Sequence, residues 1–222
     1  MKKYIARLHV ISSGTTFDQQ IESIKIACRA KVELVQLRAK NIKGAELKKL
    51  ACEALKLCEQ YGTNLIINDD PVLAAEVGAY GVHLGINDPG PDYARGILGE
   101  QAVVGGTAHS VDEFVYMAQA GVDYIGLGPY RESRTKSLNV PPLGLEGLKR
   151  ILSSVRSRYS DIPVIAIGGI TPHDLPLLLS YGVYGVAVCG AVYSSGSPIS
   201  TVAEFLKFFK ETGDGYTANR QL

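Results

Sequence analysis

The chain has 222 residues, of which 46% are hydrophobic and 20% charged, so it can bury a sizeable core and is not a mainly disordered protein. Its 23 basic and 22 acidic side chains leave a net charge of +1, which excludes the broad basic face that sequence-independent nucleic-acid binding needs. No run of about 18 apolar residues and no signal-peptide core is present, so we expect a cytoplasmic protein without a membrane segment.

Short β-branched apolar runs alternate along the chain with longer stretches in which apolar residues recur every three or four positions. The short runs predict eight strands: Leu8–Ile11, Leu34–Arg38, Leu65–Asn68, Gly81–Leu84, Val103–Thr107, Tyr124–Gly128, Val164–Gly168 and Val186–Cys189. The stretches that follow them predict helices over Asp18–Ala30, Ala45–Tyr61, Pro71–Val77, Tyr93–Leu98, Ser110–Ala120, Leu145–Tyr159, His173–Tyr181 and Thr201–Lys210.

This strict alternation of strand and helix predicts parallel strands joined by helical crossovers. Eight units of about 28 residues fit a compact single-domain (β/α)8 TIM barrel, which we place over residues 1–211. An open doubly wound sheet is the alternative, because periodicity does not distinguish a closed parallel sheet from an open one. Residues 212–222 lose the periodicity, and we expect them to form a disordered tail. Both folds place chemistry at the carboxyl ends of the strands.

Three polar residues, Gln36, Arg38 and Lys40, alternate with apolar ones at the end of the second predicted strand. Alternation of this kind projects all three from one face of an extended chain. Burying unpaired charges under the helix layer would cost several kcal/mol, so we expect this face to point into the barrel mouth, toward an anion. A solvated strand end is the alternative reading of the same pattern.

Acidic residues follow the next two predicted strands. Asp69 comes directly after the third strand, and Asp88 comes shortly after the fourth. Neighbouring strands lie about 5 Å apart, so the two carboxylates can converge on one hard cation such as Mg²⁺. Asp70 precedes Pro71 at the start of a predicted helix, where helix capping explains it equally well.

The other strand ends carry small residues and hydrogen-bond donors. Thr107 ends the fifth strand, the loop after the sixth contains Ser133 to Lys136, and glycines follow the seventh and eighth strands. Such groups suit phosphate oxygens, although a tight turn explains a Gly-Gly pair as well. None of the four histidines has a partner at a triad spacing: we expect His9 and His83 to pack in the core or rim, and only His109 to lie near the mouth. The four cysteines are expected to be buried free thiols.

From about His9 to Val192 the chain resembles the thiamine phosphate synthases. The resemblance rests on five motifs: Gln36-Leu37-Arg38-x-Lys40, Ile67-Asn68-Asp69, Gly81-Val82-His83-Leu84-Gly85 with Asp88 following, Gly128-Pro129 leading to Ser133-x-Thr135-Lys136, and Ile167-Gly168-Gly169-Ile170. Members of that family are (β/α)8 barrels that join hydroxymethylpyrimidine diphosphate to hydroxyethylthiazole phosphate and release diphosphate. The resemblance therefore implies a transferase acting on these two small molecules.

The resemblance also implies roles for particular residues. Arg38, Lys40 and Lys136 would neutralise the departing diphosphate and count as catalytic. Asp69 and Asp88 would be the Mg²⁺ ligands. The pyrimidine diphosphate would contact Gln36, Arg38, Lys40, Asn68, Thr107 and Lys136, and the thiazole phosphate would contact Ser133, Arg134, Thr135, Gly169, Cys189 and Gly190. Leu37 and Ala39, between the polar residues of the second strand, are also expected to bind substrate.

Departures from the family pattern concentrate in the sixth loop. Ser133 stands where Thr is usual, and Arg131 could pair with phosphate or be a solvated charge. A related thiazole tautomerase and a non-catalytic sensor of thiamine precursors are the alternatives. Retention of the whole diphosphate-binding set argues against the tautomerase. The sequence leaves open whether the chain forms a homo-oligomer.

Overall fold

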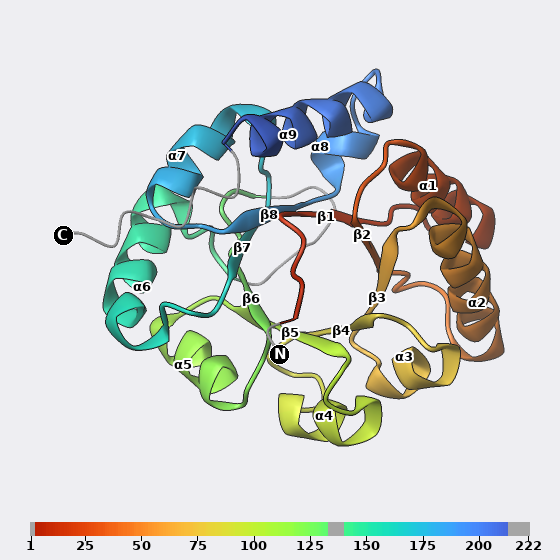
Figure 1. The fold of residues 1–222 in the computed structure, drawn as a ribbon, viewed down its shortest axis with the longest axis horizontal. Coiled ribbons are helices and arrows are strands. Elements are labelled where there is room, and N and C mark those ends of the chain that lie inside the picture. Colours follow the sequence, from red (N-terminus) through yellow and green to blue (C-terminus); the bar gives the residue numbers. More distant parts are fainter. Residues whose placement is uncertain (1–2, 133–139, 213–222) are drawn as a thin grey trace.

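The structure is a computed structural model that describes residues 3–132 and 140–212. Eight parallel strands pair in chain order and close on themselves, β8 with β1, to form a barrel (Figure 1). The strands are β1 (Leu8–Ile11), β2 (Leu34–Leu37), β3 (Asn64–Asn68), β4 (Gly81–Leu84), β5 (Val103–Ala108), β6 (Tyr124–Leu127), β7 (Val164–Ile167) and β8 (Gly185–Val188). Each predicted strand is found within one residue of its predicted ends, and the closed ring excludes the open sheet.

The helices surround the ring of strands (Figure 1). They are α1 (Phe17–Arg29), α2 (Gly44–Tyr61), α3 (Pro71–Val77), α4 (Pro91–Leu98), α5 (Val111–Gln119), α6 (Gly144–Tyr159), α7 (Leu175–Ser180), α8 (Gly190–Tyr193) and α9 (Pro198–Thr212), with a short 3-10 turn, η1 (Pro172–Asp174), before α7. None of the described helices is long and apolar enough to cross a membrane.

Three helical segments differ from the prediction. The single helix expected over His173–Tyr181 is divided, because Thr171 and Asp174 form a capping box around η1 before α7 begins. The short helix α8 was not predicted at all. Helix α9 starts at Pro198, which suits a first helical turn, and runs through Thr212, one residue into the predicted tail. The rest of that tail, residues 213–222, lies outside the described residues.

The two faces of the strands pack into two separate hydrophobic clusters. The larger cluster fills the layer between strands and helices and includes Val35, Leu37 and Ile67. The smaller cluster fills the barrel interior, with Leu34, Ile66 and Tyr124 among its members. Residues therefore alternate between the interior and the helix layer, as the pleat of a strand requires. All four cysteines are free thiols, and Cys28 and Cys58 are buried between α1 and α2 as predicted, but Cys52 and Cys189 are only partly buried, which corrects the prediction for those two.

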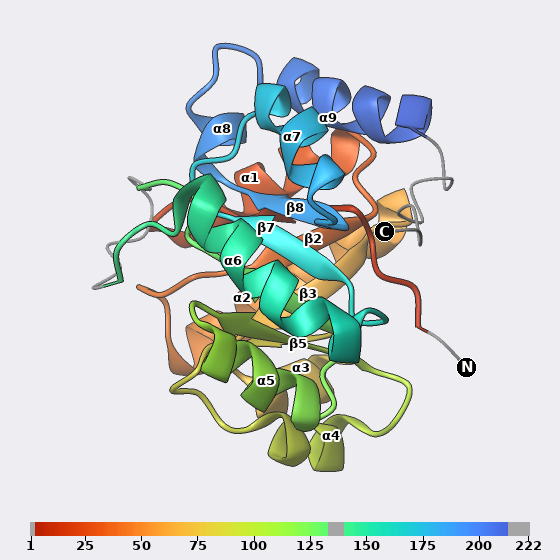
Figure 2. The same ribbon diagram turned by 90° about the vertical axis from the view of Figure 1, so that its left-hand side faces the viewer.

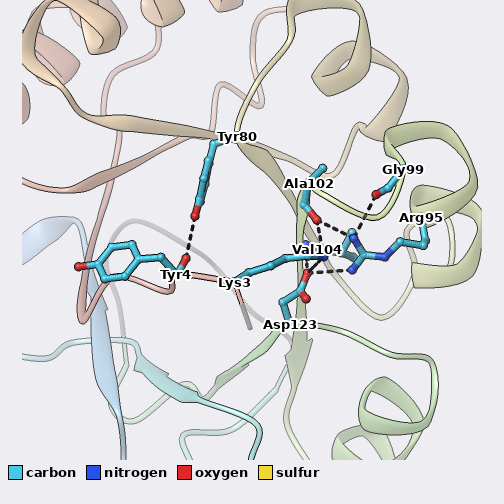
Figure 3. A network of polar contacts seen from close by, with 8 residues as sticks. All are labelled: Lys3, Tyr4, Tyr80, Arg95, Gly99, Ala102, Val104 and Asp123. Carbon is cyan, nitrogen blue, oxygen red and sulfur yellow. Dashed lines mark hydrogen bonds and ion pairs between the residues drawn. The ribbon is translucent and has the colours of Figure 1, made fainter. Parts of the chain in front are cut away.

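The amino end of the barrel is closed by the segment that precedes β1. Figure 1 shows this segment crossing the ring of strands, and Figure 2 shows it at one end of the barrel with α8 toward the other. Ile5 and Ala6 are buried in the interior cluster. The hydroxyl of Tyr80 donates to the carbonyl of Tyr4 (2.9 Å), which fixes the segment against β4 (Figure 3). The opposite end of the barrel, where the strands have their carboxyl ends, is the mouth.

Asp123 holds the same end together through three hydrogen bonds to one oxygen. Its Oδ2 accepts from Lys3 Nζ (2.9 Å), from an Arg95 guanidinium nitrogen (2.8 Å) and from the Val104 amide (2.8 Å) (Figure 3). We expect Asp123→Ala to lower the free energy of unfolding by about 3 kcal/mol, because it leaves two cations facing each other with no counter-charge. Urea denaturation measures this, and the comparison variant Lys3→Met, which removes one cation only, should cost about 1 kcal/mol. Equal losses in the two variants would contradict the shared role of Asp123.

His9 lies inside the barrel, where its ring donates to the Ala6 carbonyl (3.0 Å). Desolvation, with a smaller contribution from His83, lowers the pKa of His9 to about 3 against the opposing effect of the Ala6 bond. The unfolded chain binds this proton near pH 6.5, so stability should be full above that pH and fall progressively toward pH 3. We expect a loss of about 2 kcal/mol between about pH 6.5 and 5. Urea titrations of wild type and His9→Gln should diverge in this window, and parallel curves would contradict it.

Candidate active site

The second strand brings three of the predicted residues to the mouth. Gln36 is buried, and its register partner Ile66 belongs to the interior cluster, so Gln36 lies on the inner face of the barrel. The alternation predicted for Gln36, Arg38 and Lys40 therefore starts on this inner face. The backbone amide of Arg38 donates to the Ser12 hydroxyl (2.9 Å), which ties the end of β2 to the loop after β1. Lys40 is exposed and reaches across to β3, where it forms an ion pair with Asp69.

Asp69 and Asp88 meet beyond the ends of β3 and β4, as predicted. Each carboxyl group is a hydrogen-bond neighbour of the other. The amide of Asp69 donates to the His83 carbonyl (2.8 Å), and its φ of 69° places it in the left-handed region that Asp tolerates better than most residues. The Asp88 carboxylate accepts from the Gly85 amide (2.6 Å), which folds the loop after β4 back toward β3. The two carboxylates therefore face each other over one point of the mouth.

The environment drives the pKa values of the two acids in opposite directions. Burial raises the pKa of Asp88, and the adjoining Asp69 carboxylate raises it further. Burial also acts to raise the pKa of Asp69, but the hydrogen bond from Asp88, the Lys40 ammonium and the charge of Arg38 outweigh it, so this pKa is lowered. The pKa of Asp69 is therefore lower than that of Asp88, so Asp69 is the first of the pair to lose its proton as the pH rises.

A cavity of ≈ 170 Å³ adjoins Asp69. Lys40, Asn68 and Asp69 line one part of it, and Leu37 and Ala39 line another. Leu37 belongs to the packed layer between strands and helices, so it reaches the cavity from the opposite side of β2 to Gln36. The structure therefore separates the predicted substrate-binding segment into two faces, a polar one on the interior and an apolar one on the cavity.

Thr107 and Asn68 stand near the top of the barrel interior. Asn68 lies level with His83, and Thr107 lies level with Gly126. The ring of His83 contacts the Thr107 hydroxyl through Nε2 (2.9 Å), a link that the prediction of simple packing for His83 missed. The alternation of strand residues places His83 on the same face as Gly81. That face is the inner one, because the register partner of Gly81, Val103, belongs to the interior cluster.

The ends of β7 and β8 bring Gly169, Cys189 and Gly190 to the neighbouring part of the mouth. Gly169 has a φ of 63°, and a Cβ there would lie 2.8 Å from the Cβ of Arg131, so glycine is required. Cys189 precedes α8, and Gly190 is the first residue of that helix.

Arg131 links the loops after β6 and β7. Its guanidinium donates to both oxygens of Asp174 (2.7 and 2.6 Å) and to the Gly169 carbonyl (3.2 Å). Burial acts to raise the pKa of Asp174, but the bonds from Arg131 and Thr171 outweigh it and the pKa is lowered. Arg131 is therefore half-exposed but held by Asp174, so it is not a free loop charge, and its pairing with phosphate stays a prediction.

The remaining predicted residues of the sixth loop, Ser133, Arg134, Thr135 and Lys136, lie outside the described residues. His109, expected near the mouth, follows β5 and contacts the Gly128 carbonyl through Nδ1. Within residues 3–132 and 140–212, no three acidic, histidine or cysteine side chains gather as a metal-binding group. Asp69 and Asp88 are a group of two carboxylates.

A closed (β/α)8 barrel with acidic and cationic side chains gathered at the carboxyl ends of its strands has the architecture of a barrel enzyme. The family model described as thiamine monophosphate synthase matches residues 8–192, and the chain belongs to this family.

Two relatives and one solved structure show how far the similarity extends. A thiamine-phosphate synthase from Flavobacterium psychrophilum is 35% identical over 201 residues, which cover 90% of this chain and 98% of that protein. One from Flavobacterium johnsoniae is 40% identical over 189 residues, or 85% of this chain and 89% of that protein. The structure of thiamine phosphate pyrophosphorylase from Pyrococcus furiosus matches with a TM-score of 0.78 at 28% identity, covering 93% of this chain and 96% of that one. The predicted family, fold and enzyme class are confirmed.

Proposed function

We propose that the barrel mouth joins a pyrimidinylmethyl diphosphate to a thiazole phosphate, forming thiamine phosphate and free diphosphate. The observation that carries this is the meeting of Asp69 and Asp88 next to Arg38 and Lys40. The two acids suit a divalent cation, and the two cationic side chains suit the oxygens of a diphosphate that binds together with it. Membership of the synthase family supports the same reaction.

The chemistry needs a leaving group and no strong base. The bond between the methylene carbon and the diphosphate oxygen breaks, and the diphosphate departs with the electron pair. Arg38 and Lys40 bind and hold the departing anion, with Lys136 proposed to join them. The lone pair of the thiazole nitrogen then forms a bond to the pyrimidinylmethyl cation, which gives the thiazolium product. Positioning of the two substrates is the main task of the remaining side chains.

Asp69 and Asp88 are the residues proposed to hold Mg²⁺. Their facing carboxylates provide hard oxygen ligands, and the Lys40 ammonium beside Asp69 indicates that the pair attracts positive charge. Bound there, Mg²⁺ would add positive charge next to the diphosphate oxygens. Gln36, Asn68 and Thr107 are proposed to contact the pyrimidine diphosphate, with Leu37 and Ala39 on its apolar side. Gly169, Cys189 and Gly190, with Ser133, Arg134 and Thr135, are proposed to contact the thiazole phosphate.

A single assay tests this proposal against its alternatives. Purified protein is incubated with both precursors and Mg²⁺, and products are separated by chromatography. Formation of thiamine phosphate and diphosphate supports the synthase, isomerisation of the thiazole alone supports the tautomerase, and binding without turnover supports the sensor. Running the assay with plain and carboxylated thiazole phosphate identifies the preferred acceptor. A cytoplasmic location and a homo-oligomer stay predictions.

A further inference from the structure

A chain of buried polar side chains runs inside the barrel beneath the mouth. The Tyr124 hydroxyl contacts His83 Nδ1 (3.0 Å), and His83 Nε2 contacts the Thr107 hydroxyl (2.9 Å). All three side chains are at least 90% buried, and the Tyr124 and His83 rings are stacked with centroids 5.5 Å apart. Tyr124 and His83 thus connect the centre of the barrel to one proposed substrate contact, Thr107.

Two glycines make room for this chain. A Cβ at Gly105 would lie 2.1 Å from the Tyr124 ring, and a Cβ at Gly126 would lie 3.1 Å from the His83 ring. Both glycines occupy inward positions on β5 and β6, where larger side chains would normally fill the interior. Burying polar groups costs free energy unless they are hydrogen-bonded, so simple filling of the interior would be achieved better by apolar residues.

The chain has a defined direction of hydrogen donation. Burial raises the pKa of Tyr124 far above its usual range, so the phenol keeps its proton. Among the described residues, the hydrogen-bond partner found for this hydroxyl is His83 Nδ1. If Nδ1 donated, the phenol proton would be buried without an acceptor, at a cost of about 1–3 kcal/mol. Tyr124 therefore donates to Nδ1, the His83 proton resides on Nε2, and Nε2 donates to the Thr107 oxygen.

We propose that His83, oriented by Tyr124, is a positioning residue for the pyrimidine diphosphate. Because Thr107 accepts from His83, its own hydroxyl proton is directed to an acceptor atom in the mouth. The inference rests on the proposed function, in which Thr107 contacts this substrate. Histidine is needed at position 83 because it accepts at one ring nitrogen and donates at the other.

Two substitutions at position 83 separate this role from packing. The amide of Gln reaches the position of Nε2 and can still donate to Thr107, whereas the shorter Asn cannot. We expect His83→Asn to lower kcat/KM for the pyrimidine diphosphate about tenfold, and His83→Gln to restore most of that loss. The KM for thiazole phosphate should be unchanged in both. Val82→Ala, on the same strand but facing the helix layer, is the control for general destabilisation.

A double-mutant cycle tests whether His83 acts through Thr107. Thr107→Val should reduce kcat/KM for the pyrimidine diphosphate, and adding His83→Asn to it should cause little further loss. Additive losses would overturn the proposal, as would equal effects of the Asn and Gln substitutions. If wild-type protein forms no thiamine phosphate, the proposed function fails and this inference fails with it.

Nitrogen NMR of labelled protein provides a readout that does not depend on turnover. The proposal expects the ring of His83 to be protonated at Nε2 alone at neutral pH. Tyr124→Phe removes one oxygen and keeps the ring, so it should alter this signature while the barrel stays folded. Two results would overturn the proposal even in an active synthase. One is a proton on Nδ1 of His83 in the wild-type protein, and the other is a set of His83 nitrogen signals that Tyr124→Phe leaves unchanged.

Discussion

Replacing Asp69 by Asn should lower turnover by about 10²-fold or more, because one of the two negative charges proposed to hold Mg²⁺ is lost. The substitution removes the charge and keeps the shape of the side chain. Asn has nearly the same shape as Asp, and it tolerates the left-handed backbone that Asp69 adopts. Removing the carboxylate also breaks the ion pair with Lys40, so the Lys40 ammonium is no longer held beside position 69.

Steady-state rates measured across a range of Mg²⁺ concentrations give the result. The variant should need more Mg²⁺ for half-maximal rate and still reach a much lower maximum. Asp70→Asn is the matched control, because Asp70 caps α3 through the Leu73 amide (2.9 Å) and Asn is an equally good cap. Wild-type rates for Asp69→Asn at ordinary Mg²⁺ would remove Asp69 from the proposed metal site.

Much of the barrel could be predicted because its signals are local. Strand ends follow from runs of β-branched residues, and the cap at Asp70 follows from the proline after it. The convergence of Asp69 and Asp88 could also be predicted, since neighbouring parallel strands end at the same edge of the barrel. The strand ends and the cap are thus encoded within a few residues of the feature, and the convergence of the two acids follows from the order of the strands.

Contacts between distant loops could not be predicted in this way. The ion pair of Arg131 with Asp174 joins two loops, and the sequence offers no rule for choosing that partner over a bound phosphate. The closure of the amino end by Ile5 and Ala6 likewise depends on where the segment before β1 runs. His83 falls between these cases, because its inward position follows from strand parity whereas its bond to Thr107 depends on the register of β4 and β5.

Replacing Gly105 by Ala should destabilise the protein by about 3 kcal/mol or more, because the added methyl group would overlap the buried ring of Tyr124. The new Cβ would lie 2.1 Å from Cζ of Tyr124 and 2.5 Å from its hydroxyl oxygen. Tyr124 is 1% exposed and stacked on His83, so the ring has no free space to move into. Any shift would also break the hydrogen bond to His83 and leave a buried polar group unpaired.

Urea denaturation of four variants, Gly105→Ala, Gly96→Ala, Tyr124→Leu and the Gly105→Ala/Tyr124→Leu double variant, shows whether the clash with Tyr124 is the cause. Gly96→Ala is the matched control, because Gly96 lies within α4 with open space around it, and alanine there should be neutral or stabilise by up to about 1 kcal/mol. Combining Gly105→Ala with Tyr124→Leu removes the opposing ring, so the double variant should lose less stability than the two single losses added together. Additive losses would mean that Gly105 is required for some reason other than room for Tyr124.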